Sequence, residues 1–350
     1  MKICSRVLSL VLLASFCTGC STLGYYHQSV RGHLSLISKQ MPIADIVNDS
    51  TRDQKLIEQL KLAEELRTFA STHVKLPEND SYRSYVQLDR PYVVWSVFAA
   101  PEFSVTLHKW CFLIIGCLQY RGYFDQQDAQ AYAAELAELG LDVYVSGVTA
   151  YSTLGWLDDP LLSSMLNRGE IVTASYIFHE LAHQQFYLKG DTGFNEAFAT
   201  AVEELGVSLW FQHQGRTDDL ERYENWLSQK KVFSDFVRQG RRDLMKLYAM
   251  DLPAAAMRIE KQKLTAEFRR RFEDLARSNR QLTRYRKWMS GPLNNAQLGA
   301  LALYRDLTPA FKQLFEACHS NFDVFYRRVK SISRLSEEQR KQALEPPQAC

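Results

Sequence analysis

The chain has 350 residues with 42 basic and 40 acidic side chains, which gives a formal net charge of only +2. This near balance excludes the strongly basic character that is typical of nucleic-acid-binding proteins, so no nucleic-acid partner is expected. Beyond its N-terminal segment the chain keeps about 330 residues, enough for one large domain or two packed lobes.

The first residues of the chain are typical of an export signal. Lys2 and Arg6 precede a mostly apolar run from Val7 to Phe16, and small residues follow as far as Cys20. Such a segment is too short to span a bilayer as a mature helix and is usually cleaved. We therefore expect residues 1–19 to be a signal peptide and the mature protein to lie outside the cytoplasm.

The sequence Thr-Gly-Cys-Ser at positions 18–21 resembles a bacterial lipoprotein cleavage site. The resemblance implies that Cys20 becomes the first residue of the mature chain and carries a lipid that attaches it to a membrane. By the same resemblance, Ser21 favours the outer membrane of a Gram-negative cell, with the protein facing the periplasm. The alternatives are an ordinary signal peptide that releases a free protein and, less favoured, an uncleaved anchor.

The N-terminal half is expected to mix helices with short strands. Apolar residues at helical spacing predict a helix over 53–73, and runs rich in valine and aromatic residues predict strands. In chain order the expected elements are helices at 29–40 and 53–73, strands at 92–98, 103–107 and 112–123, a helix at 125–139, a strand at 142–148 and a loop at 151–160.

From Ile171 onward the sequence is nearly all helical in pattern. We therefore predict an α+β fold, in which an N-terminal mixed part with a small sheet (20–170) is followed by a helical part (171–350). The boundary between them is expected near residue 170.

Four of the seven cysteines remain once the signal segment and Cys20 are set aside. An even number in an oxidising compartment suggests disulfides. Two of the four flank the run Phe-Leu-Ile-Ile-Gly, which suits a bridge across a tight hairpin, and the other two would then fix the C-terminal tail. A zinc site made from the four is less favoured, because no CxxC pair exists. The expected bridges are Cys111–Cys117 and Cys318–Cys350.

The most informative stretch is His-Glu-Leu-Ala-His at 179–183. Residues four apart lie on one face of a helix, so the imidazoles of His179 and His183 can bind one divalent metal. Glu180 would lie beside that metal and can accept a proton from water as a general base. The surrounding segment 172–188 is apolar on one side and lacks Gly and Pro, which predicts the required helix.

A turn after this helix brings a third ligand into range. The sequence Lys-Gly-Asp-Thr-Gly at 189–193 predicts the end of one helix and the start of the next. His183 and Glu196 each lie about 7.5 Å from this turn, so antiparallel helices would place them at one level. Glu203 and Glu204 would lie about 18–20 Å back, beyond the metal. We therefore expect Glu196 to be the third ligand.

Other groups are expected to support the ligands and the reaction. Asn195 directly precedes Glu196, and Thr200 follows it by about one helical turn. Both are therefore candidates to hold the carboxylate of Glu196 in place. The oxyanion of a tetrahedral intermediate also needs a donor. Among 17 tyrosines, Tyr304 in the helical C-terminal part is our candidate for that donor.

The HELAH sequence followed by Phe-Asn-Glu-Ala-Phe-Ala (194–199) resembles the zinc aminopeptidase branch of the gluzincins. Together with Val-Phe-Ala-Ala-Pro-Glu-Phe-Ser (97–104), Arg-Gly-Tyr-Phe (121–124) and Ala-Tyr-Ser-Thr-Leu-Gly-Trp (150–156), it is similar to a bacterial family of predicted aminopeptidase lipoproteins over most of the chain. The resemblance implies a zincin-like catalytic part, one Zn²⁺ per chain and a peptide substrate.

Two features depart from the gluzincin pattern. The separation between His183 and Glu196 is shorter than usual. The Gly-Ala-Met-Glu-Asn segment, which binds the α-amine of the substrate in those aminopeptidases, is absent, and Glu102 would take its place only by analogy.

We therefore expect a zinc-dependent metallopeptidase that uses water activated by the metal, with an aminopeptidase as the leading interpretation. A metallo-endopeptidase and a non-catalytic zincin-like envelope lipoprotein are the alternatives. The complete set of His179, Glu180, His183 and Glu196 favours the enzyme, because a binding module has no need of a general base.

Overall fold

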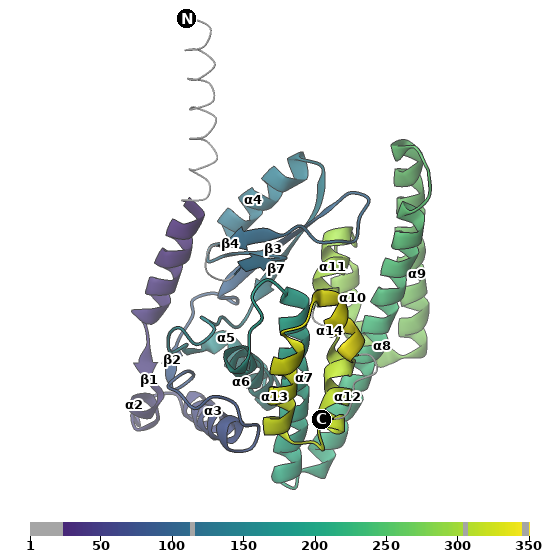
Figure 1. The fold of residues 1–350 in the computed structure, drawn as a ribbon. Coiled ribbons are helices and arrows are strands. Elements are labelled where there is room, and N and C mark those ends of the chain that lie inside the picture. The colour runs from purple at the N-terminus through teal and green to yellow at the C-terminus, as the bar shows by residue number, and fades with distance from the viewer. Residues whose placement is uncertain (1–23, 113–115, 304–306, 345–349) are drawn as a thin grey trace, which may run out of the picture.

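The computed structural model describes residues 24–112, 116–303, 307–344 and 350 (Figure 1). Residues 24–37 form an N-terminal helix. The strands are β1 Met41–Pro42, β2 Ser84–Val86, β3 Val94–Pro101, β4 Trp110–Phe112, β5 Gly116–Leu118, β6 Arg121–Tyr123, β7 Leu141–Val148 and β8 Leu161–Leu162. The helices of the N-terminal half are α2 Ile43–Val47, α3 Gln54–Thr72, α4 Gln126–Glu138 and α5 Ser163–Leu166.

The second half of the described chain is helical, as expected. Its helices are α6 Glu170–Gln185, α7 Thr192–His213, α8 Thr217–Tyr248, α9 Ala254–Ser278, α10 Arg286–Met289, α11 Asn295–Leu303, α12 Thr308–Ala317, α13 Phe322–Ile332 and α14 Glu337–Leu344, with a 3₁₀ turn at Arg280–Tyr285. The predicted α+β class is therefore confirmed. In the described residues, no helix combines the length and the apolar character that a crossing of the bilayer requires.

The central sheet has the strand order β6-β3-β7, with every neighbouring pair antiparallel. Alternate residues of β3 face opposite sides, so Trp95 and Val97 pack with Leu136 of α4, whereas Phe98 packs with Ala296 of α11. The sheet therefore lies between α4, above it in Figure 1, and α11. A second small sheet has the strand order β1-β2-β8. It pairs β2, the strand after α3, with β8, the strand before α5.

The segment 103–107 was predicted to be a strand, and this was wrong. Its backbone turns back on itself, with the N–H of Ser104 donating to the carbonyl of Pro101 at 3.1 Å. Val105 and Leu107 enter two different hydrophobic clusters, and this produces the alternating pattern without a partner strand. The strand expected over 112–123 is likewise divided among the end of β4, β5 and β6.

The largest hydrophobic core joins α3, α6, α7, α12 and α13. Its residues come from parts of the chain both before and after the boundary predicted near residue 170. One face of α7 contributes Phe194 and Phe198, whose rings meet Phe311 of α12 at 5.0 and 5.8 Å. Because successive helical residues are about 100° apart, Glu196 points away from that face and toward α6. The packing of α7 thus directs its carboxylates to the helix that carries HELAH.

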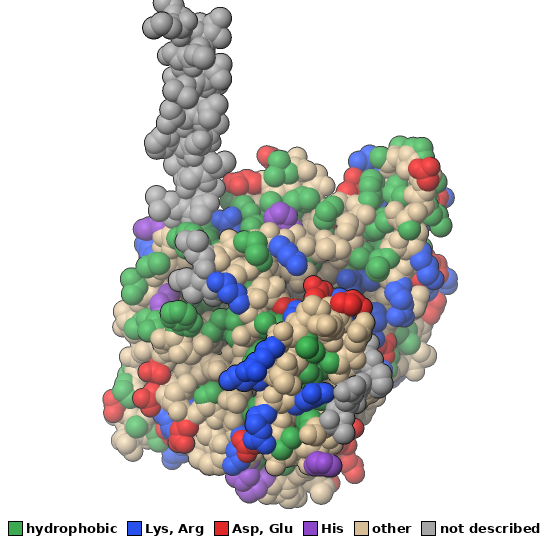
Figure 2. All heavy atoms as spheres, viewed as in Figure 1, with side chains coloured by type: hydrophobic (Ala, Val, Ile, Leu, Met, Phe, Trp, Pro, Cys, Tyr) green, Lys and Arg blue, Asp and Glu red, His purple; other side chains and the backbone are tan. Residues whose placement is uncertain are grey.

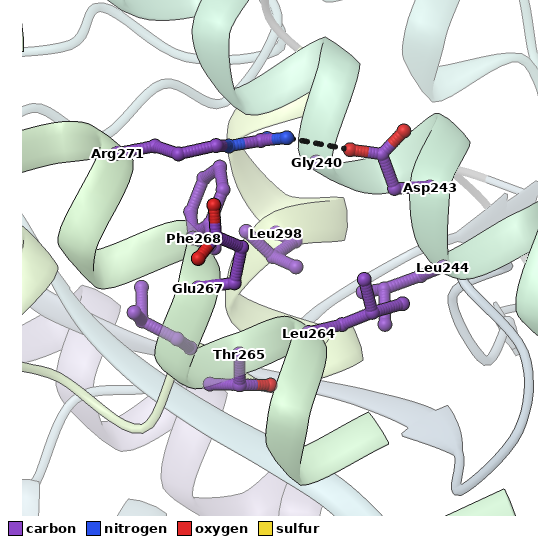
Figure 3. A pocket seen from close by; sticks show the side chains of 10 residues that line it. Gly240, Asp243, Leu244, Leu264, Thr265, Glu267, Phe268, Arg271 and Leu298 are labelled. Atoms are coloured by element: carbon purple, nitrogen blue, oxygen red, sulfur yellow. Dashed lines mark hydrogen bonds and ion pairs between the residues drawn. The ribbon is translucent and has the colours of Figure 1, made fainter. Parts of the chain in front are cut away.

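The long helices α8 and α9 pack against each other and have a hydrophobic cluster of their own (Figure 1). A narrow cavity of about 20 Å³ lies between them and is bordered by Gly240, Phe268 and the ion pair of Arg271 with Asp243 at 3.2 Å (Figure 3). A cavity of this size holds one water molecule at most. It is therefore a packing gap and not a ligand site.

Both predicted disulfides are confirmed. Cys111 and Cys117 are directly paired residues of the β4–β5 hairpin and are bonded to each other. Cys318, at the end of α12, is bonded to Cys350 at the end of the chain. The second bridge closes a loop of 32 residues that contains α13 and α14, so it fixes the C-terminal segment against the main core.

Candidate metal centre

The helices α6 and α7 form an antiparallel pair joined by residues 186–191. Asp191 caps α7 by accepting from the N–H of Phe194 at 3.1 Å. The side chain of Asn195 accepts from the N–H of Leu188 at 2.7 Å and donates to its carbonyl at 2.8 Å. Asn195 therefore holds the loop one residue before Glu196, and its proposed support for that ligand stays a prediction.

The two helices approach closely where the HELAH sequence begins. A Cβ added to Gly206 of α7 would lie 2.8 Å from the ring of Phe178, which is fully buried and directly precedes His179. Only a glycine permits this contact, because the ring has no room to retreat. The small residue thus sets the distance between the histidines of α6 and the carboxylates of α7.

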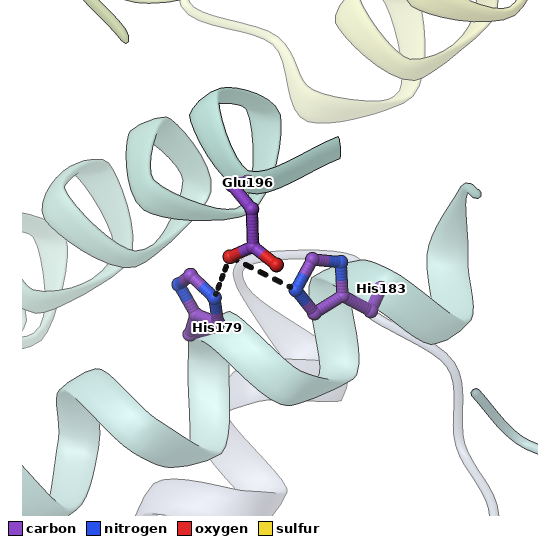
Figure 4. Close-up of side chains that lie close together, drawn as sticks. All are labelled: His179, His183 and Glu196. Carbon is purple, nitrogen blue, oxygen red and sulfur yellow. Dashed lines mark ion pairs between the residues drawn. The ribbon is translucent and has the colours of Figure 1, made fainter. Parts of the chain in front are cut away.

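The predicted ligands meet between the helices (Figure 4). Oε2 of Glu196 lies 3.3 Å from Nε2 of His179 and 3.7 Å from Nε2 of His183. One ligand atom from each of the three residues falls within 4.8 Å of the others. All three side chains are at most 13 % exposed. This is the arrangement that the turn at 189–193 predicted.

The donor set fits a divalent metal ion. With metal–ligand bonds of about 2.1 Å, the ligand atoms of a tetrahedral site lie about 3.4 Å apart. The separations of 3.3 and 3.7 Å from Glu196 to the two histidines lie close to this value, and all three ligand atoms lie within 4.8 Å of one another. Two imidazoles and one carboxylate leave a fourth position open, which is typical of catalytic and not of structural sites.

The electrostatics of the cluster also favour a cation. Burial alone lowers the pKa of His179, but hydrogen bonds to Glu196 and Glu203 raise it well above its ordinary value. Burial raises the pKa of Glu196, yet the charge of His183 and the hydrogen bonds of both histidines lower it to about 2. The buried carboxylates therefore need positive charge at this point, which a divalent ion supplies in place of imidazole protons.

Glu180 lies in the same cluster. Burial raises the pKa of its carboxyl group, and the charges of His179 and His183 oppose that rise. A carboxylate whose pKa is raised holds a proton more readily than an exposed one, as a general base at the reaction centre requires.

Glu203 contacts His179, which was not predicted from the sequence. Its distance along α7 was expected to place it beyond the metal, but Oε2 of Glu203 lies 3.2 Å from Nδ1 of His179. His179 is one turn farther from the connecting loop than His183, so the matching position on α7 is also farther along. Seven residues make nearly two turns, so the spacing from Glu196 to Glu203 could have revealed that they share a face.

A carboxylate on Nδ1 fixes the ring and directs Nε2 toward the metal position. We expect Glu203→Gln to weaken metal binding by about 10–100-fold, measured by titration with Zn²⁺ or Co²⁺. The control is Glu204→Gln, the same replacement at the neighbouring position, where the carboxylate faces Lys312 and Lys230 at 3.1 and 3.8 Å. Equal affinities for the two variants would contradict this role.

The remaining predicted residues have separate outcomes. Thr200 is buried, one turn after Glu196, and its proposed support for that ligand stays a prediction. Tyr304 and Cys20 lie outside the described residues. Glu102 forms a bidentate ion pair with Arg258 at 2.6 and 2.8 Å, so its carboxylate is already neutralised and does not support a role in binding a substrate amine.

A network of buried polar groups attaches α6 to the N-terminal half directly after the second histidine. Gln184 accepts from the side-chain amide of Asn79 at 2.7 Å and donates to the hydroxyl of Ser81 at 3.1 Å. Asp159, only 1 % exposed, accepts from the N–H of Thr153 and lies 3.4 Å from the amide of Gln184. The loops 77–82 and 151–160 are thereby held against the HELAH helix.

The β4–β5 hairpin packs against the α6–α7 connection. A Cβ added to Gly116 would be 2.7 Å from the side chain of Lys189 and 3.1 Å from the backbone of Gly190. Tyr120 follows this hairpin, and burial together with the charges of Glu196, Tyr187 and Glu180 raises the pKa of its hydroxyl well above the ordinary value. Tyr120 is therefore a protonated phenol in the field of both site carboxylates.

Comparison with known proteins identifies the family of the chain. Neither the curated proteins nor the solved structures include a match to the chain. A family model described as "Putative aminopeptidase" matches residues 24–344, which include the metal cluster and nearly all of the described chain. That description indicates a peptidase acting on peptide substrates. The chain belongs to the putative aminopeptidase family.

Proposed function

We propose that this protein is a zinc-dependent metallopeptidase with a zincin-like catalytic part, and that it acts as an aminopeptidase. The observation that carries the proposal is the meeting of His179, His183 and Glu196 beside Glu180 in one buried cluster. The family supports peptide hydrolysis. The donor set of two imidazoles and a carboxylate supports Zn²⁺ as the ion.

In the proposed reaction, His179, His183 and Glu196 hold the ion and leave one position for water and substrate. Bound zinc would lower the pKa of the attacking water and polarise the scissile carbonyl. Glu180 accepts one proton of that water while the water oxygen attacks the carbonyl carbon. Glu180 then donates the proton to the leaving amine as the C–N bond breaks. Glu203 keeps the His179 ring in orientation throughout.

Tyr120 is our candidate among the described residues for the donor to the developing oxyanion, because the charges of both Glu196 and Glu180 act on its hydroxyl and its raised pKa keeps it protonated. We expect Tyr120→Phe to lower kcat by about 10²–10³-fold with little change in KM, because such a donor acts mainly in the transition state. Tyr144→Phe is the control, as Tyr144 belongs to the same hydrophobic cluster around Phe98. If both variants keep full kcat, the donor lies elsewhere, and Tyr304 remains the earlier candidate.

The protein is further proposed to be an outer-membrane lipoprotein that faces the periplasm, with the lipid on Cys20. The basic and apolar N-terminal segment and Thr-Gly-Cys-Ser support export and lipidation. The disulfides Cys111–Cys117 and Cys318–Cys350 are consistent with an oxidising compartment.

The proposal is tested with purified protein by metal analysis and by cleavage assays. We expect one zinc per chain, loss of activity with a chelator and recovery with Zn²⁺. Aminoacyl-arylamides should be cleaved, and quenched peptides with blocked N-termini should not. Cleavage of the blocked peptides alone would identify an endopeptidase. A chain that binds no metal and cleaves neither substrate would be the non-catalytic envelope protein.

A further inference from the structure

The N-terminal helix at residues 24–37 is firmly attached along one face. The backbone of Gly32 lies so close to Phe124 that a Cβ would be 2.1 Å from its ring. Gln28 accepts from the N–H of Phe124 at 3.1 Å and donates to the carbonyl of Gly122 at 3.3 Å. Leu36 is 4 % exposed and belongs to the main core. These contacts fix which sides of the helix face outward.

A second face of this helix exposes an apolar stripe. Val30 and Leu34 are 58 % and 59 % exposed, and Tyr26 and Ile37 are 37 % and 36 % exposed. At about 100° per residue these four positions fall within about 80° of one another, and the centre of the stripe lies roughly 160° from the centre of the attached face. Figure 2 shows hydrophobic side chains at the edge of the molecule where Figure 1 places this helix.

The third face of the helix is basic and polar. His27 and Arg31 are exposed beside the stripe, and Lys39 is exposed just after the helix. Between residues 21 and 44 the chain contains no Asp or Glu. An exposed apolar stripe flanked by cationic and neutral polar groups is the pattern of helices that lie in the interface of an anionic bilayer.

We propose that this stripe binds the surface of a bilayer that contains anionic lipids, with the helix lying along the membrane. The charge of the flanking residues fits anionic headgroups. The helix also begins four residues after Cys20, so a lipid at that position would hold it at the same surface. A second copy of the chain is disfavoured, because four partly exposed side chains offer far less than the roughly 800 Å² per partner of a stable interface.

The experiment uses the chain from residue 20 onward, which includes every described residue, with Cys20→Ser so that no acyl chain contributes. Flotation with phosphatidylcholine vesicles, with and without phosphatidylglycerol, measures partitioning. We expect binding to the anionic vesicles that weakens at high salt. The double variant Val30→Glu with Leu34→Glu should lower the partition coefficient by about tenfold or more, because two aliphatic contacts are lost.

The matched control replaces Met250 and Ile259, which are 57 % and 53 % exposed on the α8–α9 hairpin, with Glu. This control adds the same negative charge. Its partition coefficient should stay close to that of the parent chain, lowered only slightly by repulsion from the anionic lipids. Circular dichroism and disulfide content show that both variants are folded, and the measurement does not depend on peptidase activity. The proposal is overturned if the parent chain fails to bind, if both double variants bind equally, or if Val30→Glu with Leu34→Glu instead dissociates a dimer seen by sedimentation.

Discussion

Replacing Glu180 with Gln is expected to reduce kcat/KM by about 10²–10⁴-fold, which is the range of general acid–base catalysis. The amide keeps the size of the side chain but cannot accept the proton of the attacking water. His179, His183 and Glu196 are unchanged, so the variant should still bind one metal ion per chain. Steady-state assays with an aminoacyl-arylamide and metal analysis of the same sample measure the two quantities separately.

The control for this change is Glu221→Gln, which makes the same replacement at an exposed position of α8. It should leave both kcat/KM and the metal content unchanged. Unaltered hydrolysis in Glu180→Gln would contradict the proposed mechanism. Loss of activity together with loss of metal would instead assign Glu180 a role in building the site.

Arg67→Met is expected to lower the free energy of unfolding by about 3–5 kcal/mol, because several carbonyls lose hydrogen bonds from a charged donor at once. Arg67 of α3 is fully buried. Its guanidinium donates to the carbonyls of Pro77, Asn79 and Ser81, each at 2.9 Å, and to the hydroxyl of Ser71 at 2.6 Å. Methionine fills similar space but cannot donate to these carbonyls, and within the described residues only that of Pro77 keeps a second donor, the hydroxyl of Ser71 at 3.3 Å.

Urea denaturation measures the change as a lower transition midpoint at an unchanged slope. Arg83→Met is the control, because Arg83 follows the loop that Arg67 contacts but is 39 % exposed and lies 3.9 Å from Asp80. Its loss should lower the free energy of unfolding by less than about 1 kcal/mol. Arg67→Lys should restore little stability, since an ammonium cannot reach the same set of acceptors. Equal midpoints for the Arg67 and Arg83 variants would refute this account.

The sequence predicted the cluster of possible ligands well because that cluster is local. His179 and His183 share a helix face by spacing alone, and a short turn returns Glu196 to their level. The same helical arithmetic should have included Glu203, whose exclusion rested on distance along the axis and not on its angle around it.

Other parts of the fold depend on contacts that no local pattern contains. The segment 103–107 alternates like a strand because Val105 and Leu107 enter two separate clusters. Tyr120 follows the β4–β5 hairpin, which rests on the α6–α7 connection through a contact between residues more than 70 positions apart. The attachment of Gln184 to residues 79–81 likewise joins positions more than 100 apart in the chain.

The compact spacing of the metal cluster has a consequence for the kinetics of folding. Only 24 residues separate His179 from Glu203, whereas α11 reaches β3 across 194 residues, as the bond from Asn295 to Pro101 shows. Short loops close at a lower entropic cost, so the α6–α7 pair should assemble before α11 covers the sheet. A metal ion bound at that stage would stabilise the folding nucleus, and refolding in its presence should be faster as well as more complete.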